Sequence, residues 1–506
     1  MREASRNWHL LDEASDGVAG ISAERALREL LANRQPRRTV VVAVIDGGVD
    51  TAHVDLIASL WSNAKETAGN GRDDDSNGYV DDVRGWNFIG GKDGRNVHHD
   101  TYEVARLQAL CTNAGSAGET LPAALRSQCE QISRDFMQDK QEAEATLTQI
   151  RMIGEALDRA VPMLKQALGT DSLTVERVSA LRAASPQVEQ AKQIYLQLAA
   201  NGLTQDEVEE ARRSYDSRVK YGLDPAYNPR PIVGDKYTDT SERAYGNRDV
   251  TGPDAGHGTH VAGIIAAARG NNQGIDGVAP GARIMSVRTV PDGDERDKDV
   301  ANAIRYAVDN GAQIINMSFG KAYSPYKSAV DEAVKYADSR GVLMIHAAGN
   351  DGENLDESPS YPTASYEGEG RAANWIEVGA SSWKSADSLA APFSNYSRQR
   401  VDVFAPGVDI LSTVPGGSYE QESGTSMAAP VVSGLAALIM AYYPDLSAPD
   451  VKRIILESAT KRGPQMVIKP GTDGEKVAFG SLSATGGIVN AYAALQMAEQ
   501  MSRAGR

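Results

Sequence analysis

Ser426 is the residue of this sequence best placed for nucleophilic chemistry. It lies in the small-residue motif GTSMAAP, at the head of an apolar run that extends to Tyr443. A serine hydroxyl is a weak nucleophile at neutral pH unless a base accepts its proton and donors stabilise the charge that forms on the attacked carbonyl. Backbone N–H groups at a helix start can supply such donors. The motif therefore predicts a reactive serine, provided that the rest of the chain supplies a base.

Three further motifs contain candidate partners for this serine. Asp46 ends the apolar run TVVVAVI and precedes two glycines, which is typical of a strand that ends at a functional edge of a sheet. His257 opens the motif HGTHVAG, and Asn350 closes the motif AAGN. An imidazole can accept the proton, a carboxylate can orient the imidazole, and an amide can donate to the oxyanion. Two other histidines, His260 and His346, are interpreted as buried, hydrogen-bonded groups.

These motifs and their order resemble those of the subtilisin-like serine proteases, or subtilases. The order Asp46, His257, Ser426 differs from the orders found in chymotrypsin-like and α/β-hydrolase enzymes. The resemblance implies that Ser426 attacks the scissile carbonyl and that His257 accepts its proton and later delivers it to the leaving amine. It also implies that Asp46 orients the imidazole, and that Asn350 and the Ser426 N–H stabilise the oxyanion.

The resemblance covers about residues 20–98 and 231–497. It implies a subtilisin-like three-layer α/β fold with a mostly parallel central sheet. It further implies a substrate-binding segment that pairs with the substrate backbone, and walls for a primary specificity pocket. The residues expected to form them are Ser318, Phe319, Gly320, Ala347, Ala348, Gly349 and Ser360.

Alternating strand and helix patterns support a parallel sheet independently of the resemblance. Short apolar runs predict strands at 39–46, 283–287, 313–317, 342–347, 375–379 and 401–404. Helical patterns such as 300–308 and 329–337 separate them, so both faces of the sheet are expected to be covered. The apolar run 427–443 includes Pro430 and is shorter than the roughly 20 residues of a membrane span. We interpret it as a buried central helix.

A helical segment of about 130 residues separates Asp46 from His257. Apolar residues recur every three or four positions from Ala143 to Leu168, and Thr204 with Glu207 forms a capping-box pattern. The expected organisation is an N-terminal extension with a helix (1–38), the first part of the core (39–99), an all-helical insertion (100–228), the second part of the core (229–498) and a tail (499–506). We favour a place for the insertion beside the active site over a passive surface decoration.

Two cysteines, Cys111 and Cys129, lie in the expected insertion. They are either joined in a disulfide or free in a helical segment, and the sequence leaves both readings open.

The segment DDDSNGYVDD, which begins at Asp73, is a candidate calcium loop. Oxygens at alternate positions of such a loop converge on a hard cation, and the glycine permits the sharp turn. A full EF-hand would have glutamate where Arg84 stands, so a shorter loop is expected. A solvated acidic turn is the alternative. The expected ligands are Asp73, Asp75, Asn77, the carbonyl of Tyr79, Asp81 and Asp82.

Composition limits the class of protein. The formal net charge of −16 over 506 residues argues against nucleic acid as a partner, because phosphates require a basic surface. The chain begins without a charged-then-apolar signal segment. We expect a secreted or periplasmic, calcium-stabilised endopeptidase without a membrane span, present here as a processed form without its propeptide. The alternatives are a maturation or acyl-transferring enzyme dedicated to one partner, and a catalytically inactive binding scaffold.

Overall fold

The computed structural model describes residues 4–112, 121, 123–384 and 386–504. The chain divides into two compact units. The core unit comprises Met1–His98 and Pro229–Arg506, and the helical unit comprises His99–Asn228. The helical unit is thus inserted between two parts of the core unit, within one residue of the range expected from the sequence.

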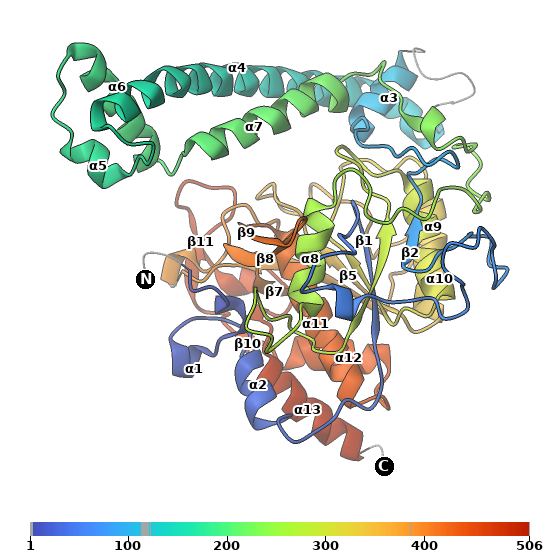
Figure 1. The fold of residues 1–506 in the computed structure, drawn as a ribbon. Helices are drawn as coiled ribbons and strands as arrows, with labels where there is room; N and C mark the ends of the chain where they lie inside the picture. Colours follow the sequence, from blue (N-terminus) through green and yellow to red (C-terminus); the bar gives the residue numbers. More distant parts are fainter. Residues whose placement is uncertain (1–3, 113–120, 122, 385, 505–506) are drawn as a thin grey trace. The chain divides into compact units, whose positions relative to one another are not determined.

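A nine-stranded sheet forms the centre of the core unit, in the order β10-β13-β7-β6-β5-β4-β1-β3-β2 (Figure 1). All neighbouring strands are parallel except β10 and β13. The prediction of an α/β fold with a mostly parallel sheet is confirmed. The strands are β1 (Val41–Asp46), β2 (Gly85–Asn87), β3 (Arg283–Arg288), β4 (Ile314–Met317), β5 (Leu343–Ala347), β6 (Trp375–Ser381), β7 (Val403–Pro406), β10 (Thr460–Lys461) and β13 (Gly487–Ile488).

The strand order reverses direction at β1, which lies between β4 and β3. The chain passes from β1 to β2 and then β3 on one side, and then crosses to β4 on the other. Such a switch point opens a crevice at the carboxyl ends of the strands, where α/β proteins place their sites. Asp46 ends β1, Ser318 directly follows β4, and Asn350 follows β5 closely. The topology therefore gathers three of the predicted site residues at one edge of the sheet.

Helices cover both faces of the sheet, because its central strands are apolar on both sides. The first apolar core includes residues of α8 (Gly256–Ala266), α11 (Thr425–Tyr442), α12 (Ala448–Glu457) and α13 (Ala491–Ala504). The second includes residues of α9 (Asp297–Asp309) and α10 (Lys327–Ser339). In α11, 89% of the residues are buried. Among the described residues α11 is the one helix long and apolar enough to cross a membrane, and its burial agrees with a core helix.

Short elements outside the main sheet have weaker sequence patterns, and the sequence did not predict them. They are the hairpin β8 (Ile410–Val414) and β9 (Ser418–Glu422), and the pair β11 (Met466–Ile468) and β12 (Lys476–Ala478).

Near the N-terminus lie α1 (Glu13–Asp16) and α2 (Ala23–Glu29). Ser22 occupies the N-cap position of α2, but its side chain makes no capping hydrogen bond.

The helical unit is built on a long helix, α4 (Cys129–Leu168), which continues through Pro162 (Figure 1). Small apolar clusters join it to α5 (Val175–Ala180), α6 (Pro186–Ala200) and α7 (Gln205–Ser217). The capping box of Thr204 and Glu207 is present at the start of α7. The unit also contains the earlier helix α3 (Glu103–Cys111), the short 3-10 helix Ala123–Gln128 and the π-helix Arg218–Gly222.

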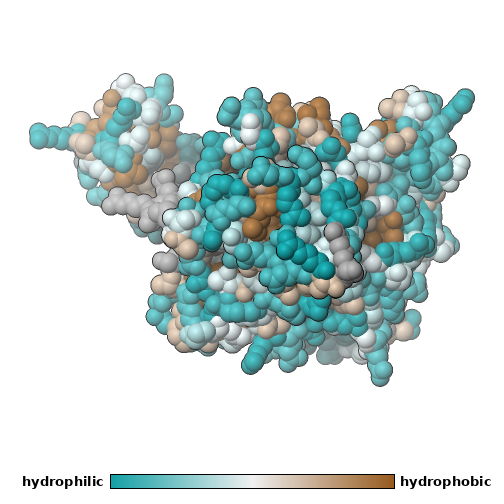
Figure 2. Space-filling model, turned by 90° about the horizontal axis from the view of Figure 1, so that it is seen from below, coloured by the Kyte–Doolittle hydropathy of each residue, from teal (hydrophilic) through white to brown (hydrophobic). Residues whose placement is uncertain are grey.

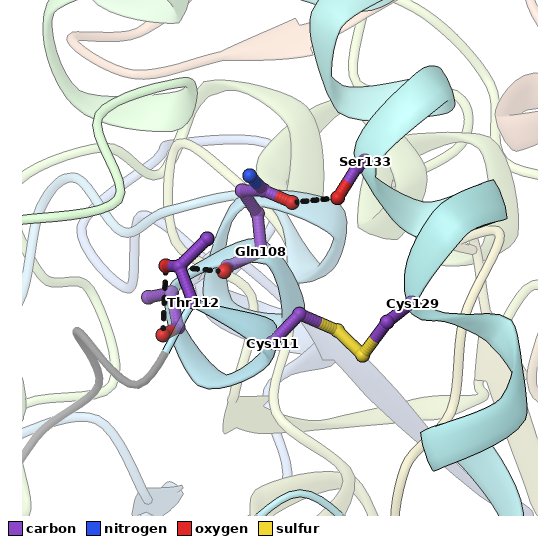
Figure 3. Close-up of a disulfide and its surroundings, with 6 residues drawn as sticks. Gln108, Cys111, Thr112, Cys129 and Ser133 are labelled. Atoms are coloured by element: carbon purple, nitrogen blue, oxygen red, sulfur yellow. Dashed lines mark hydrogen bonds between the residues drawn. A yellow bond between two sulfur atoms is a disulfide. The ribbon is translucent and has the colours of Figure 1, made fainter.

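A disulfide joins Cys111, the last residue of α3, to Cys129, the first residue of α4 (Figure 3). The two Cα atoms are 5.6 Å apart. Beside it, the Ser133 hydroxyl donates to the side-chain oxygen of Gln108 over 2.7 Å. This settles the choice that the sequence left open. A covalent link of this kind fits a unit whose apolar clusters are small, since such units gain most from a cross-link.

The surface is largely hydrophilic on the face shown in Figure 2, with small, scattered apolar patches. This agrees with a chain in which 24% of the residues are charged.

Candidate active site

Asp46 and His257 form a hydrogen-bonded pair at the carboxyl edge of the sheet. The Nδ1 atom of His257 lies 2.9 Å from Oδ1 and 3.0 Å from Oδ2 of Asp46. The Gly47 backbone N–H also donates to Oδ1 over 2.7 Å. The carboxylate side chain is 3% exposed, whereas the imidazole side chain is 41% exposed. One nitrogen of the ring is thus held by a buried carboxylate, while the ring itself remains open to solvent.

A close approach between α8 and the β1 edge makes this pair possible. A Cβ atom at Gly258 would lie 2.2 Å from the carbonyl oxygen of Gly48 and 3.1 Å from the Asp46 side chain. Any side chain at 258 would therefore push the helix away from the strand. The Thr259 hydroxyl also accepts from the backbone N–H of Asp50 over 2.8 Å. The glycine and threonine of the HGTH motif thus dock the helix that carries His257.

The electrostatic surroundings raise the pKa of His257. Desolvation of the ring would lower it, but the Asp46 carboxylate, with smaller contributions from Glu422 and Asp254, outweighs this and raises the pKa to about 9. His260, one turn further along α8, behaves in the opposite way. It is fully buried, its Nε2 atom contacts the Glu420 carbonyl over 3.1 Å, and burial lowers its pKa to about 4. The exposed ring faces the site and the buried one supports the fold.

Ser426 is the second residue of α11 and is tied to the segment after β4. Its hydroxyl donates to the Ser318 carbonyl over 3.1 Å, and the Ser318 hydroxyl donates to the Ser426 carbonyl over 2.9 Å. The buried Asn316 donates to the Ser318 hydroxyl over 2.9 Å and accepts from Ser433 over 2.8 Å. This chain of polar contacts joins the end of β4 to two positions of α11, Ser426 and Ser433, which lie about two turns apart. It fixes the height of the serine against the sheet.

Within the described residues no hydrogen bond joins Ser426 to His257. This differs from the expectation that their side chains meet directly. The two residues are nevertheless linked through Ser318: this residue lines a cavity of about 220 Å³ together with His257 and Asp46, and its carbonyl accepts from the Ser426 hydroxyl. The hydroxyl faces a carbonyl in this state, and rotation about the Cα–Cβ bond would release it. Contacts between nucleophile and base are often loose in enzymes without substrate.

Asn350 is oriented by the residue that precedes the serine. Its Oδ1 atom accepts from both the backbone N–H and the hydroxyl of Thr425, each over 2.9 Å. Because a backbone N–H can only donate, the oxygen must face Thr425 and the Nδ2 amino group must point the other way. A Cβ atom built on Gly424 would lie 3.5 Å from both the Asn350 Nδ2 atom and the Ser426 backbone nitrogen. Two donors therefore flank one small space beside the serine.

The predicted pocket walls also come together. A Cβ atom on Gly320 would lie 2.4 Å from the Ser360 hydroxyl, so the two segments are in contact there. Ala347 and Ala348 are buried at the end of β5, and Gly349 adopts a positive φ of 102°. The Gly349 N–H donates to the Thr425 hydroxyl over 3.1 Å. The β5 end is thus bonded to the residue beside Ser426, while Phe319 lies on the β4 side.

Part of the acidic loop forms a compact group of carboxylates. Glu66, Asp73 and Asp75 each place one carboxylate oxygen within 4.8 Å of the others. Sequence analysis missed Glu66, which lies before the motif and whose Oε1 atom accepts from the Asp74 and Asp75 N–H groups. Glu66 reaches the loop only because the chain folds back, and no motif in the sequence indicates this contact.

The remaining predicted ligands of this loop have other partners. Asp81 accepts from Arg248 and from the N–H groups of Asn70 and Gly71. Asp82 accepts from the Tyr306 hydroxyl and from the Asn77 amide. The Asn77 oxygen accepts from the Tyr79 N–H over 2.8 Å. These contacts stabilise the loop and tie it to α9, and only Asp73 and Asp75 of the predicted set lie in the carboxylate group.

The fold is of the α/β class, and the comparisons with known proteins assign its family. A family model described as the subtilase family matches residues 37–472, so the chain belongs to this family and the resemblance is confirmed. Membership supports serine protease activity in general terms.

Several curated relatives share part of the chain. It is 47% identical over 184 residues to the "Thermophilic serine proteinase" of Bacillus sp. (strain AK1). The matched residues make up 36% of this chain and 42% of that protein. It is 40% identical over 210 residues to "Subtilisin BL" of Lederbergia lenta, covering 41% of this chain and 71% of that protein. The "Major intracellular serine protease" of Bacillus subtilis (strain 168) is 40% identical over 215 residues, or 42% of this chain and 62% of that protein.

Proposed function

We propose that the protein is a serine endopeptidase that forms an acyl-enzyme on Ser426. The observation that carries the proposal is the pair of donors beside the serine. The Asn350 amino group and the Ser426 N–H flank one small space, and Ser318, the hydrogen-bond partner of Ser426, lines a cavity with the His257–Asp46 pair. A tetrahedral intermediate of peptide hydrolysis needs an oxyanion site of this kind.

Each residue then has one role in the reaction. The Ser426 hydroxyl turns from Ser318 toward the imidazole, loses its proton to His257 and attacks the scissile carbonyl. The oxyanion accepts from Asn350 and from the Ser426 N–H. His257 passes the proton to the leaving amine, and water then releases the acyl group by the reverse sequence. Asp46 holds Nδ1 as the donor toward itself, so that the other nitrogen, Nε2, carries the catalytic lone pair.

The test is covalent labelling by a fluorophosphonate probe. We expect stoichiometric labelling of the wild-type protein, none of Ser426→Ala, and normal labelling of Ser481→Ala, an exposed serine elsewhere in the core unit. The Asn350→Ala variant should retain the nucleophile but lose about 10²–10³ in kcat on a peptide substrate, as loss of such a donor does in a subtilisin. Absence of labelling in a folded wild-type protein would reject the assignment.

Digestion of an unstructured protein separates a general endopeptidase from an enzyme dedicated to one partner. Casein, for example, would be degraded by the first and left intact by the second.

We further propose that the group Glu66, Asp73 and Asp75 binds calcium. The donors are all hard carboxylate oxygens, and their separation of up to 4.8 Å matches oxygens that share an ion at 2.3–2.6 Å. Bound calcium would offset the mutual repulsion of the three charges and hold the loop that Glu66 closes.

Thermal unfolding tests the calcium proposal without reference to activity. A chelator should lower the Tm of the wild-type protein, and added Ca²⁺ should restore it, because an ion that binds only the folded state stabilises it by about 2.7 kcal/mol at 100 times its Kd. Asp73→Asn should abolish the response, whereas Asp74→Asn should retain it, because Asp74 bonds to Thr67 and Asn70 instead of joining the group. An unchanged Tm in chelator would remove the site.

The location proposed for the protein is outside the reducing cytoplasm. The disulfide between Cys111 and Cys129 supports this, because such bonds persist in oxidising compartments. A calcium-dependent fold would point the same way.

A further inference from the structure

A second histidine–carboxylate pair lies in the interior of the core unit. His346 on β5 is 0% exposed, and it stands in register with Glu377 on β6, so both side chains lie on the same face of the sheet. The His346 Nδ1 atom is 2.7 Å from Glu377 Oε1, and its Nε2 atom is 2.8 Å from the Phe319 carbonyl oxygen. The ring of Trp375 packs against the imidazole, and its N–H donates to the other Glu377 oxygen over 2.8 Å.

The number of protons in this pair follows from the atoms that surround it. A backbone carbonyl can only accept, so the Nε2 atom of His346 must carry a proton and donate it to Phe319. The contact between Nδ1 and Glu377 needs one more proton, on either atom. The two side chains therefore hold two protons between them. A neutral histidine beside an ionised glutamate would have only one, and one of the two buried contacts would be lost.

The carbonyl that His346 holds belongs to the proposed substrate-binding segment. Successive carbonyls of this segment take partners from different elements: Ser318 faces Ser426 on α11, and Phe319 faces His346 on β5. Ser318 lines the cavity beside His257, whereas the Phe319 carbonyl is bonded to a fully buried histidine. The His346 contact fixes the peptide plane between Phe319 and Gly320, and the Ser426 contact holds the plane between Ser318 and Phe319. Together they set the direction of the groups that remain for a substrate.

The pair also lies next to the opposite wall of the pocket. Glu377 and Ser360 line the same small cavity of about 30 Å³, and Ser360 contacts Gly320. The His346–Glu377 pair thus contacts the Phe319 side directly and lies close to the Ser360 side. The polar pair is surrounded by the apolar residues of the second core, including Met344, Met317 and Trp375. A polar pair in such a place is costly unless every contact is made.

We propose that His346, held by Glu377, is a positioning residue that sets the primary specificity pocket by anchoring the Phe319 carbonyl. The proposal rests on the proposed function, because it takes Ser318, Phe319 and Gly320 to be the segment that binds the substrate. The pair does not touch the reacting atoms. Its effect is to hold the wall against which the side chain before the scissile bond packs.

The main test compares two variants that differ in the donor to Phe319. His346→Phe keeps an aromatic ring but removes the donor. It should raise KM by about tenfold for peptides with a large side chain before the scissile bond. The reason is that the Phe319 carbonyl would be left as an unsatisfied buried acceptor, and the cost of one such group corresponds to a factor of this size. It should change KM much less for peptides with glycine there, and should change kcat little. Glu377→Gln should keep KM within about twofold, since a glutamine amide can donate to Nδ1 while its oxygen accepts from Trp375.

A double variant covers the case in which His346→Phe does not fold. In His346→Gln with Glu377→Gln, the first glutamine can donate to Phe319 and accept from the second, which still accepts from Trp375. We expect this uncharged network to restore the wild-type KM for large side chains. A tenfold increase that persists in the double variant, in a folded protein, would contradict the proposal.

Spectroscopy tests the proton count directly. In a ¹H–¹⁵N spectrum of histidine-labelled protein, the signal that His346→Phe removes should come from a ring whose Nε2 atom is protonated. An unprotonated Nε2 would overturn the assignment. An unchanged KM for every peptide in His346→Phe, with only a lower Tm, would reduce His346 to a structural residue.

Fluorophosphonate labelling separates these failures from a failure of the proposed function. The small probe does not fill the pocket, so His346→Phe should be labelled at the wild-type rate. Normal labelling with no dependence of KM on the substrate side chain would reject the positioning role alone. Absence of labelling in both proteins would reject the proposed function.

Discussion

The two histidine–carboxylate pairs of the core unit, His257–Asp46 and His346–Glu377, contain the same chemical groups but differ in exposure and in the number of hydrogen-bond partners. In the pair of His257 and Asp46, the carboxylate is buried and the imidazole is 41% exposed, with only Nδ1 engaged. In the pair of His346 and Glu377, the ring is fully buried and both nitrogens are engaged. A free nitrogen can exchange a proton with a substrate, whereas an occupied one can only hold a position. Exposure and the number of partners thus separate a base from an anchor.

The largest contrast is expected when each pair loses its carboxylate charge. Asp46→Asn should lower kcat by about 10⁴, because an amide favours the wrong tautomer of the catalytic ring. Glu377→Gln should leave kcat within about twofold, because His346 can keep its proton on Nε2 without a charged partner. Peptide hydrolysis by both variants at one pH measures the contrast. Equal losses in the two variants would mean that the pairs are not distinct in function.

The pH dependence of kcat/KM should report the exposed pair. His257 must be neutral to accept a proton, and its pKa is raised to about 9. Activity should therefore rise with pH, about tenfold per unit on the acid side, and level off near the pKa. Asp254→Asn removes one of the charges that raise the pKa and should shift the midpoint to lower pH. A midpoint at or below 6.5 in the wild-type protein would contradict this account of the charges around His257.

A third histidine shows what burial does without any partner. His9 is 1% exposed, and among the described residues neither of its ring nitrogens has a hydrogen-bond partner. Burial, with smaller contributions from Arg269 and His260, lowers its pKa to about 3. Below pH 6.5 the unfolded chain binds a proton that the folded chain refuses. Titration of His9 therefore does not affect the free energy of unfolding above pH 6.5, and it lowers that free energy progressively as the pH drops from 6.5 toward 3.

The smallest expected effect follows from replacing this residue. His9→Phe removes the titrating group and keeps an aromatic ring, so the loss of stability on acidification should be shallower by up to about 1.4 kcal/mol per pH unit. Denaturant unfolding at neutral and acid pH measures the free energy of unfolding of both proteins. An identical acid slope would show that the ring is not buried as described. Part of the slope should remain, because His260 also has a lowered pKa.

Much of the fold could be predicted because its patterns are local. The six predicted strands of the central sheet are short apolar runs, several of them rich in Val and Ile, and α9, α10 and α11 have clear helical or apolar patterns. The short strands β2, β10 and β13 of the same sheet were not predicted, because two or three residues carry no such pattern. The capping box at Thr204 needs only residues three apart. The hairpin β8–β9 was missed, since β9 is the polar segment Ser418–Glu422, in which none of the residues is fully buried. Its pairing depends on a neighbouring strand rather than on its own sequence.

The sequence predicted candidate members for the site but not the contacts that they make. The small-residue motifs around Asp46, His257 and Ser426 reflect tight packing, and such packing leaves a mark in the sequence. The hydrogen bond from Ser426 to Ser318, in place of one to His257, leaves no such mark in the sequence. Likewise Glu66 joins Asp73 and Asp75 only because the chain turns back on itself before the acidic motif.

By itself, the sequence determined the type and order of the elements and the identity of the groups able to do chemistry, because both depend on residues close together in the chain. The tertiary structure decided which of these groups meet. It directed the Asn350 amino group by placing the Thr425 N–H against its oxygen, and it enclosed His346 between Glu377 and Phe319. Hydrogen bonds have a range of about 3 Å, so partners that are distant in the chain are chosen only when folding has brought them to that distance.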